Sequence, residues 1–182
     1  MDKISRLLTK KKGQIWVETV IYTLIGLAII GIVLGGAKPQ IDKKKNEIVI
    51  EQSIEALQNI DIKIGEVLAA MGNQRIADLK ISKGSLFFNI DNRSIYWIID
   101  SNFEYSEEGV PISIGLLTVT TDKSADKWKV KIERKYNLKL TFDGKDNGIK
   151  ELSYAAVPYR IVFENNGRDN STGETVVDIR AA

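Results

Sequence analysis

The N-terminal third of the chain contains a long apolar run. Residues 19–37 form a stretch of 19 positions without a charge, rich in Ile, Leu, Val and Gly. At about 1.5 Å per residue, a helix over this stretch is roughly 28 Å long, close to the hydrocarbon thickness of a bilayer. The pattern therefore predicts a helix that crosses a membrane.

From Gln40 to about Met71 the pattern becomes that of an amphipathic helix, which we expect to be buried along one stripe. We expect one helix from near Gln14 to near Met71, ended by Gly72 and Asn73. Gly35, Gly36 and Pro39 predict an interruption or bend within it. The stripe consists of apolar residues that recur every three or four positions: Ile50, Ile54, Leu57, Ile60, Ile64, Val67 and Leu68.

From Arg75 onward the apolar period changes to two, which is typical of β-strands. In KWKVKIE, residues 127–133, apolar and charged residues alternate, which predicts a strand with one face on a core and one in water. SIYWIID, residues 94–100, lacks this alternation, so we expect a central strand or one covered on both faces. The other strand-like runs are ADLKIS, SLFFNID, GLLTVTT, NLKLTFD, YRIVFEN and TVVDIR.

These patterns together predict an α+β fold, with a long N-terminal helix followed by an antiparallel β-sheet head. The chain contains no cysteine and no histidine. Disulfide frameworks, thiolate metal sites and histidine-based catalysis are therefore excluded. The remaining Asp, Glu, Lys, Tyr and Ser residues form no convincing catalytic constellation, so we expect no enzyme activity, no cofactor and no metal.

Basic residues are concentrated before the apolar run, where residues 1–13 carry five positive charges and one negative charge. This bias favours a cytoplasmic N-terminus and places the residues after Pro39 outside, although Lys43, Lys44 and Lys45 weaken it. Without residues 1–13 the net charge falls from +2 to about −2. The head has no basic excess, and we expect no nucleic-acid partner for it.

The junction KKGQIWVE, residues 11–18, combines basic residues, a glycine and a glutamate that precedes the apolar run. With the apolar helix and the β-rich head, it resembles a type IV pilin and is similar to the class III signal peptides of archaeal pilins. This resemblance is specific in residues 10–37 and architectural beyond them.

The resemblance implies that a prepilin peptidase recognises Lys11 and Lys12 and cuts between Gly13 and Gln14. The chain would then consist of a leader (1–13), an N-terminal helix (14–72) and a head (73–182). It also implies a single-pass membrane protein with a cytoplasmic N-terminus that becomes part of an extracellular filament at the cell surface. The implied partners are other pilin subunits, the peptidase, an assembly ATPase and a membrane platform protein.

Glu18 would become the fifth residue after cleavage. A carboxylate at the centre of a membrane helix costs on the order of 2.5 to 3.5 kcal/mol, so it needs a partner. The new α-amino group of Gln14 would lie one helical turn away, and pairing within the chain or with a neighbouring subunit are both open. In the pilin family this pairing is thought to set the axial register of subunits. Otherwise Glu18 is a membrane-surface residue favoured by the helix N-terminus.

Two glycines in the apolar run, Gly31 and Gly35, have the spacing that lets helix backbones approach closely. They are candidate assembly residues, although glycine is also frequent in membrane helices generally. The resemblance further implies local unwinding near Gly35, Gly36 and Pro39 during assembly.

Two N-glycosylation motifs lie in predicted loops, at Asn92 and at Asn170. An extracellular head would make both possible sites of modification, as is common in archaeal pilins; such motifs also arise by chance.

Two alternatives to a filament remain. The apolar run and the small residues up to Ala37 also resemble a secretory signal that is removed to release a soluble β domain. An uncleaved chain would be a membrane-anchored receptor or adhesion module that does not polymerise. The sequence does not distinguish adhesion, motility, DNA uptake and secretion as functions of such a filament.

Overall fold

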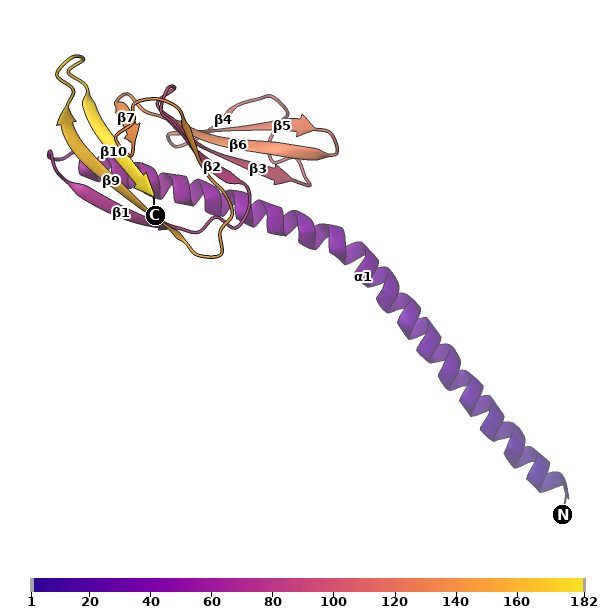
Figure 1. Ribbon diagram of the computed structural model, residues 1–182. Helices are drawn as coiled ribbons and strands as arrows, with labels where there is room; N and C mark the ends of the chain where they lie inside the picture. The colour runs from indigo at the N-terminus through magenta and orange to yellow at the C-terminus, as the bar shows by residue number, and fades with distance from the viewer. Residues whose placement is uncertain (1, 182) are drawn as a thin grey trace. The chain divides into compact units, whose positions relative to one another are not determined.

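The computed structural model describes the backbone of residues 2–181 and the side chains of residues 16–181. The fold is α+β, as predicted (Figure 1). It divides into two compact units, Met1–Lys44 and Lys45–Ala182. The elements are α1 (Asp2–Val67), β1 (Gln74–Leu79), β2 (Ser85–Asn89), β3 (Ser94–Ser101), β4 (Ile112–Ile114), β5 (Leu117–Ser124), β6 (Lys127–Lys135), β7 (Lys139–Phe142), β8 (Ile149–Leu152), β9 (Tyr159–Arg168) and β10 (Thr175–Ala181).

Helix α1 is α-helical without interruption through Gly35, Gly36 and Pro39. Of the interruption or bend predicted at these residues, the interruption is therefore absent from α1, and the bend stays a prediction. Proline removes one backbone hydrogen bond and costs about 3 kcal/mol in a helix interior. The bonds of the flanking turns remain, and apolar helices commonly tolerate such residues.

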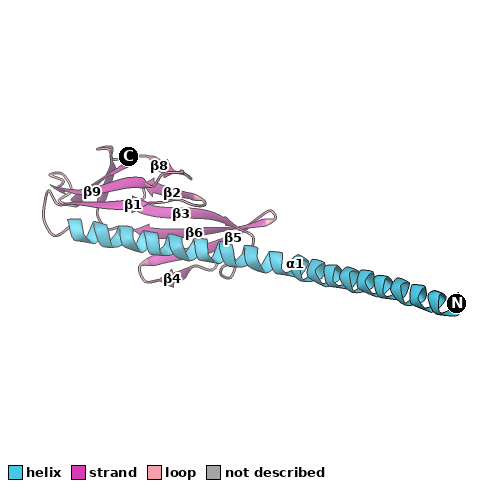
Figure 2. Ribbon diagram, turned by 90° about the horizontal axis from the view of Figure 1, so that it is seen from below, coloured by secondary structure: helices cyan, strands magenta, loops and turns pink. Residues whose placement is uncertain are grey.

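The C-terminal part of α1 belongs to the same compact unit as the strands, and Figure 2 shows it lying along them. The predicted buried stripe is confirmed from Ile50 to Val67, and its six apolar side chains join the strands in one core. Each contributes roughly 1.5 to 3 kcal/mol of burial free energy. Leu68 is an exception, 42% exposed, because the helix ends at Val67 and not near Met71.

The strands form two sheets, and the head is not purely antiparallel. Sheet A has the order β1-β9-β10-β7 and sheet B the order β4-β5-β6-β3-β2-β8. All neighbours in the described sheets are antiparallel except β10 and β7, which pair in parallel. All eight predicted runs form strands, and β3 is central in sheet B as expected. Strands β4 and β8, both at sheet edges, were not predicted.

Strand β6 shows the predicted alternation. Val130 and Ile132 are fully buried, whereas Lys127 and Lys129 are exposed on the opposite face. The inner face of sheet B therefore contributes to the core, and the lysines of this strand lie on its solvent face.

The C-terminus of α1 is held by Asn165 of β9. The buried Asn165 side chain donates from Nδ2 to the carbonyl oxygen of Val67 at 3.0 Å, and its Oδ1 accepts from the Gly167 amide at 2.9 Å. Its backbone carbonyl accepts from the Gly72 amide at 2.8 Å. Asn165 thus satisfies a carbonyl group that the end of the helix would otherwise leave unpaired, and it also binds the amides of Gly72 and Gly167.

We expect Asn165→Ala to destabilise the head by about 1 to 3 kcal/mol, because it leaves the Val67 carbonyl and the Gly167 amide without this partner. Denaturant unfolding of the detergent-solubilised chain, followed by tryptophan fluorescence, measures the change. Asn166→Ala is the matched control, since Asn166 is the exposed neighbour. Equal effects of the two substitutions would contradict this role of Asn165.

Candidate functional site

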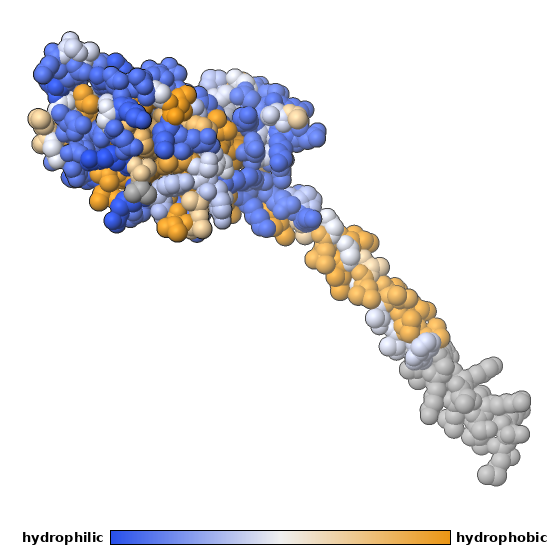
Figure 3. Space-filling view, in the orientation of Figure 1, coloured by the Kyte–Doolittle hydropathy of each residue, from blue (hydrophilic) through white to orange (hydrophobic). Residues whose placement is uncertain are grey.

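The candidate site is the apolar surface of α1 in the first compact unit. Large apolar side chains from Trp16 to Leu34 are exposed on every side of the helix, and Figure 3 shows this surface in orange. Among the described helices, α1 is the one long and apolar enough to cross a membrane, a property that it shares with signal sequences. Membrane anchoring or a signal-sequence role is therefore supported.

Such a surface needs a cover that the rest of the described chain does not provide. A helix that is apolar all round is normally buried in a protein core or in lipid. Each large apolar side chain that stays in water loses roughly 1.5 to 3 kcal/mol of burial free energy. We therefore expect the exposed segment to lie in lipid, to pack against other helices, or to do first one and then the other.

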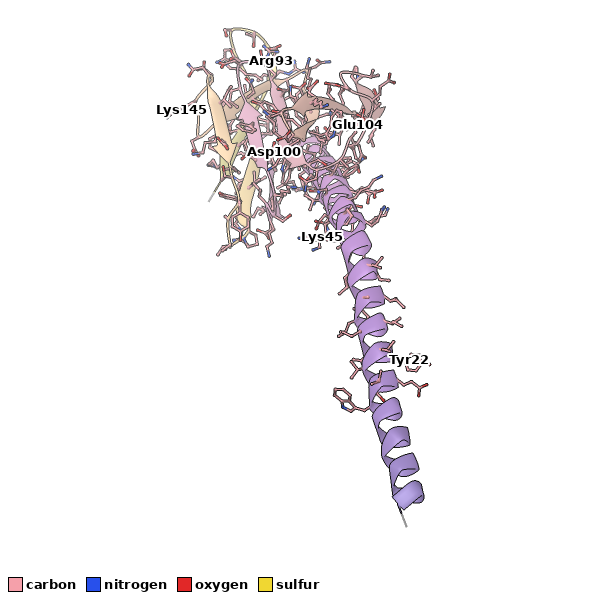
Figure 4. The ribbon with its side chains drawn as sticks, turned by 90° about the vertical axis from the view of Figure 1, so that its right-hand side faces the viewer. Tyr22, Lys45, Arg93, Asp100, Glu104 and Lys145 are labelled. Atoms are coloured by element: carbon pink, nitrogen blue, oxygen red, sulfur yellow. The ribbon has the colours of Figure 1, made fainter. Side chains whose placement is uncertain are left out.

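Polar groups within this segment are arranged compatibly with an apolar environment. The Thr23 hydroxyl donates to the backbone carbonyl of Thr19 at 2.8 Å, so it needs no water. Trp16 and Tyr22 are 71% and 69% exposed, and Figure 4 shows Tyr22 projecting from the helix. Both lie near the N-terminal end of the apolar run, where aromatic residues commonly occupy the membrane interface.

Glu18 is exposed, directly before the uncharged run. Its predicted partner, the α-amino group of Gln14, would exist only after cleavage. Lys11, Lys12, Gly13 and Gln14 lie outside the residues whose side chains are described. The processing site and the pairing of Glu18 therefore stay predictions.

The two candidate assembly glycines are not required by contacts within the chain. Gly31 and Gly35 are four residues apart and so lie on one helix face. A Cβ added to either would meet no atom within 4 Å outside the adjacent helix backbone. The role of this small-residue face in assembly therefore stays a prediction.

The structure distinguishes the two glycosylation motifs. Asn92 is exposed, but Ser94, which supplies the hydroxyl of its motif, is 1% exposed at the start of β3. Asn170, Ser171 and Thr172 are all exposed in the turn between β9 and β10. The complete motif is therefore accessible at Asn170 and only partly accessible at Asn92.

Asp169 holds the turn that presents Asn170. Its Oδ1 accepts from the Ser171 amide at 2.8 Å, and its Oδ2 lies 2.7 Å from Nζ of Lys139. The bonds from Lys139 and from the Ser171 hydroxyl hold the pKa of Asp169 well below its usual range. The carboxylate thus stays ionised and keeps the turn in place at neutral pH.

If the head is glycosylated after it folds, we expect higher occupancy at Asn170 than at Asn92, since the motif hydroxyl must be reached as well as the asparagine. Glycopeptide mass spectrometry measures both sites in one sample. Thr172→Ala should remove the glycan at Asn170, whereas Thr172→Ser should keep it. Equal or higher occupancy at Asn92 would show that modification precedes the formation of β3.

Sequence reasoning missed the polar contacts between α1 and the strands. Arg134 Nε of β6 lies 2.7 Å from Oδ1 of Asp61, and Nζ of Lys83 donates to Oδ1 of Asn46. One signal was present: Asn46 precedes Ile50 by four residues, so it continues the buried stripe with a polar side chain. Its partner is 37 residues away and has no local signature.

The architecture, a long apolar N-terminal helix followed by a β-sheet domain, is consistent with that of pilins. Comparison with known proteins finds no protein-family model, no curated protein and no solved structure that matches this chain.

Proposed function

We propose that this chain is the structural subunit of an extracellular filament of the type IV pilus kind. It is processed by a prepilin peptidase after Gly13 and assembles through its N-terminal apolar helix. The observation that carries the proposal is the apolar surface of α1 from Trp16 to Leu34, exposed on all sides and joined through one helix to a β-sheet head.

The proposal requires two successive environments for the same helix. Before assembly the helix spans the membrane, with its N-terminus in the cytoplasm. Its transfer from lipid to a bundle of identical helices gains little hydrophobic free energy, since both environments are apolar. Close helix packing at Gly31 and Gly35 contributes, and an assembly ATPase with its membrane platform protein supplies the work.

A second candidate function rests on the same helix, because a signal sequence or a simple anchor would also be long and apolar. In that case the head is a secreted or membrane-anchored β domain, a receptor or adhesion module that does not polymerise.

The N-terminus of the native protein separates these functions, and intact mass or N-terminal peptide sequencing measures it. We expect the mature chain to begin at Gln14. A chain that begins at Lys38 would establish a secreted domain, and one that retains Met1 would establish an uncleaved anchor. Gly13→Leu provides the control, since it should leave the leader attached if the peptidase cuts after Gly13.

A further inference from the structure

The segment between β1 and β2 contacts α1 through a lysine and a buried asparagine. Nζ of Lys83 donates a hydrogen bond to Oδ1 of Asn46. Asn46 is 6% exposed and lies one turn before Ile50 in the stripe that faces the core. The amine of Lys83 is therefore placed next to the side-chain amide of Asn46, and holding two reactive groups side by side makes a reaction between them effectively unimolecular.

Lys83 is held in place through its own backbone and that of its neighbour. Nε1 of the buried Trp97 donates to the Lys83 carbonyl at 3.1 Å. The next residue, Gly84, has φ +77° and packs so tightly on Ile98 that a Cβ there would lie 2.1 Å from the Ile98 carbonyl oxygen. The lysine is therefore presented to Asn46 by a fixed segment.

The surroundings of Lys83 favour the uncharged amine, which is the nucleophilic form. Burial lowers the pKa of Lys83, and the nearby charge of Lys127 lowers it further, whereas the Asp100 carboxylate raises it. Asp100 lies on β3 and is labelled in Figure 4, as is Lys45, the residue before Asn46. The Lys83 amine thus interacts with the amide of Asn46 through a hydrogen bond and with the carboxylate of Asp100 through its charge.

We propose that Lys83 and Asn46 form an intramolecular isopeptide bond. The neutral Nζ attacks Cγ of Asn46, so that the Nζ–Cγ bond forms as the Cγ–Nδ2 bond breaks. The proton lost by the amine passes to Nδ2, and ammonia leaves. The reaction needs no oxidant, reductant or further reactant.

The bond would fasten α1 covalently to the strands. Asn46 is the second residue of the compact unit that contains the head, and Lys83 precedes β2. A force applied through the apolar segment would then reach sheet B through a covalent bond as well as through the packed core.

The test is peptide mapping of the full-length protein, purified in detergent, denatured and digested after Lys and Arg. Cleavage at Arg75 separates Asn46 from Lys83, so their two peptides stay joined only if the bond exists. We expect a branched peptide, lighter by one ammonia than the sum of its parts. Intact mass alone is insufficient, since an N-terminal Gln14 and the Asn147-Gly148 and Asn166-Gly167 pairs can also lose ammonia.

Three variants complete the experiment. Asn46→Ala and Lys83→Met should each abolish the branched peptide, whereas Lys129→Met, at an exposed lysine of β6, should retain it. Separate Asn46 and Lys83 peptides of full mass from the native protein would overturn the proposal. The bond does not require polymerisation, so it should also be present in a variant that forms no filaments.

Discussion

Replacing Glu18 by alanine is expected to abolish filament formation, while membrane insertion and removal of the leader continue. The substitution makes insertion easier, because it removes a carboxylate that costs on the order of 2.5 to 3.5 kcal/mol in a membrane helix. It also removes the group that would pair with the α-amino group of Gln14. The remaining apolar surface offers no comparable charge to fix one axial register, so we expect at least about a tenfold loss of filaments, equivalent to 1.4 kcal/mol.

The measurement is the amount of subunit in filaments sheared from cells, relative to subunit in the membrane, with electron microscopy of the sheared fraction. Glu18→Gln keeps the size of the side chain and removes its charge, so it should fail like Glu18→Ala. Thr23→Ala changes the same helix without changing charge and should assemble. Filaments from Glu18→Ala in normal amounts would refute the register role. If the mature N-terminus of that variant is still Gln14, processing is intact and the defect lies in assembly.

Gly84→Ala should give the largest destabilisation among single methyl additions to the head. At φ +77° the left-handed conformation of an alanine is unfavourable by about 1 to 2 kcal/mol of conformational free energy. Its Cβ would also lie 2.1 Å from the Ile98 carbonyl oxygen, so β3 or the preceding segment must move. Overpacking of this kind costs typically 1 to 3 kcal/mol more. The sum is a large fraction of the roughly 5 to 15 kcal/mol that stabilises an ordinary domain.

Gly109→Ala separates the two contributions. Gly109 has a similar φ of +70°, but a Cβ there would meet no atom within 4 Å. We expect it to cost only the conformational part, so the difference between the variants in denaturant midpoint measures the steric part. Equal midpoints would show that the segment before β2 moves freely away from Ile98. Such mobility would also weaken the case for a fixed Lys83.

Local periodicity predicted the parts of this fold that depend on which residues face the core. The buried stripe from Ile50 to Val67 and the alternation in β6 are both confirmed. They could be predicted because each pattern repeats often enough for its period to be recognised. Strands β4 and β8 contain three and four residues, too few to establish a period. The parallel pairing of β10 with β7 depends on residues far apart in sequence, so no local pattern reveals it.

The candidate site likewise has features that the sequence predicted and features that it did not. The exposed apolar surface of α1 follows from composition, and the sequence alone predicted it. The contact between Asn46 and Lys83 arises only when the segment before β2 folds back on the helix, so sequence analysis missed it. The processing residues Lys11 to Gln14 would act through recognition by another protein, so their role remains a prediction.

The position of β10 also constrains when the head can fold. β10 is an interior strand of sheet A, between β9 and β7, although it follows all the other described strands in the sequence. Until it arrives, β7 has no neighbour in that sheet, and the core lacks Val177 and Ile179. For a head that crosses a membrane, folding of sheet A must therefore follow the export of β10. Until then the chain exposes apolar side chains and unpaired strand edges, which favour aggregation.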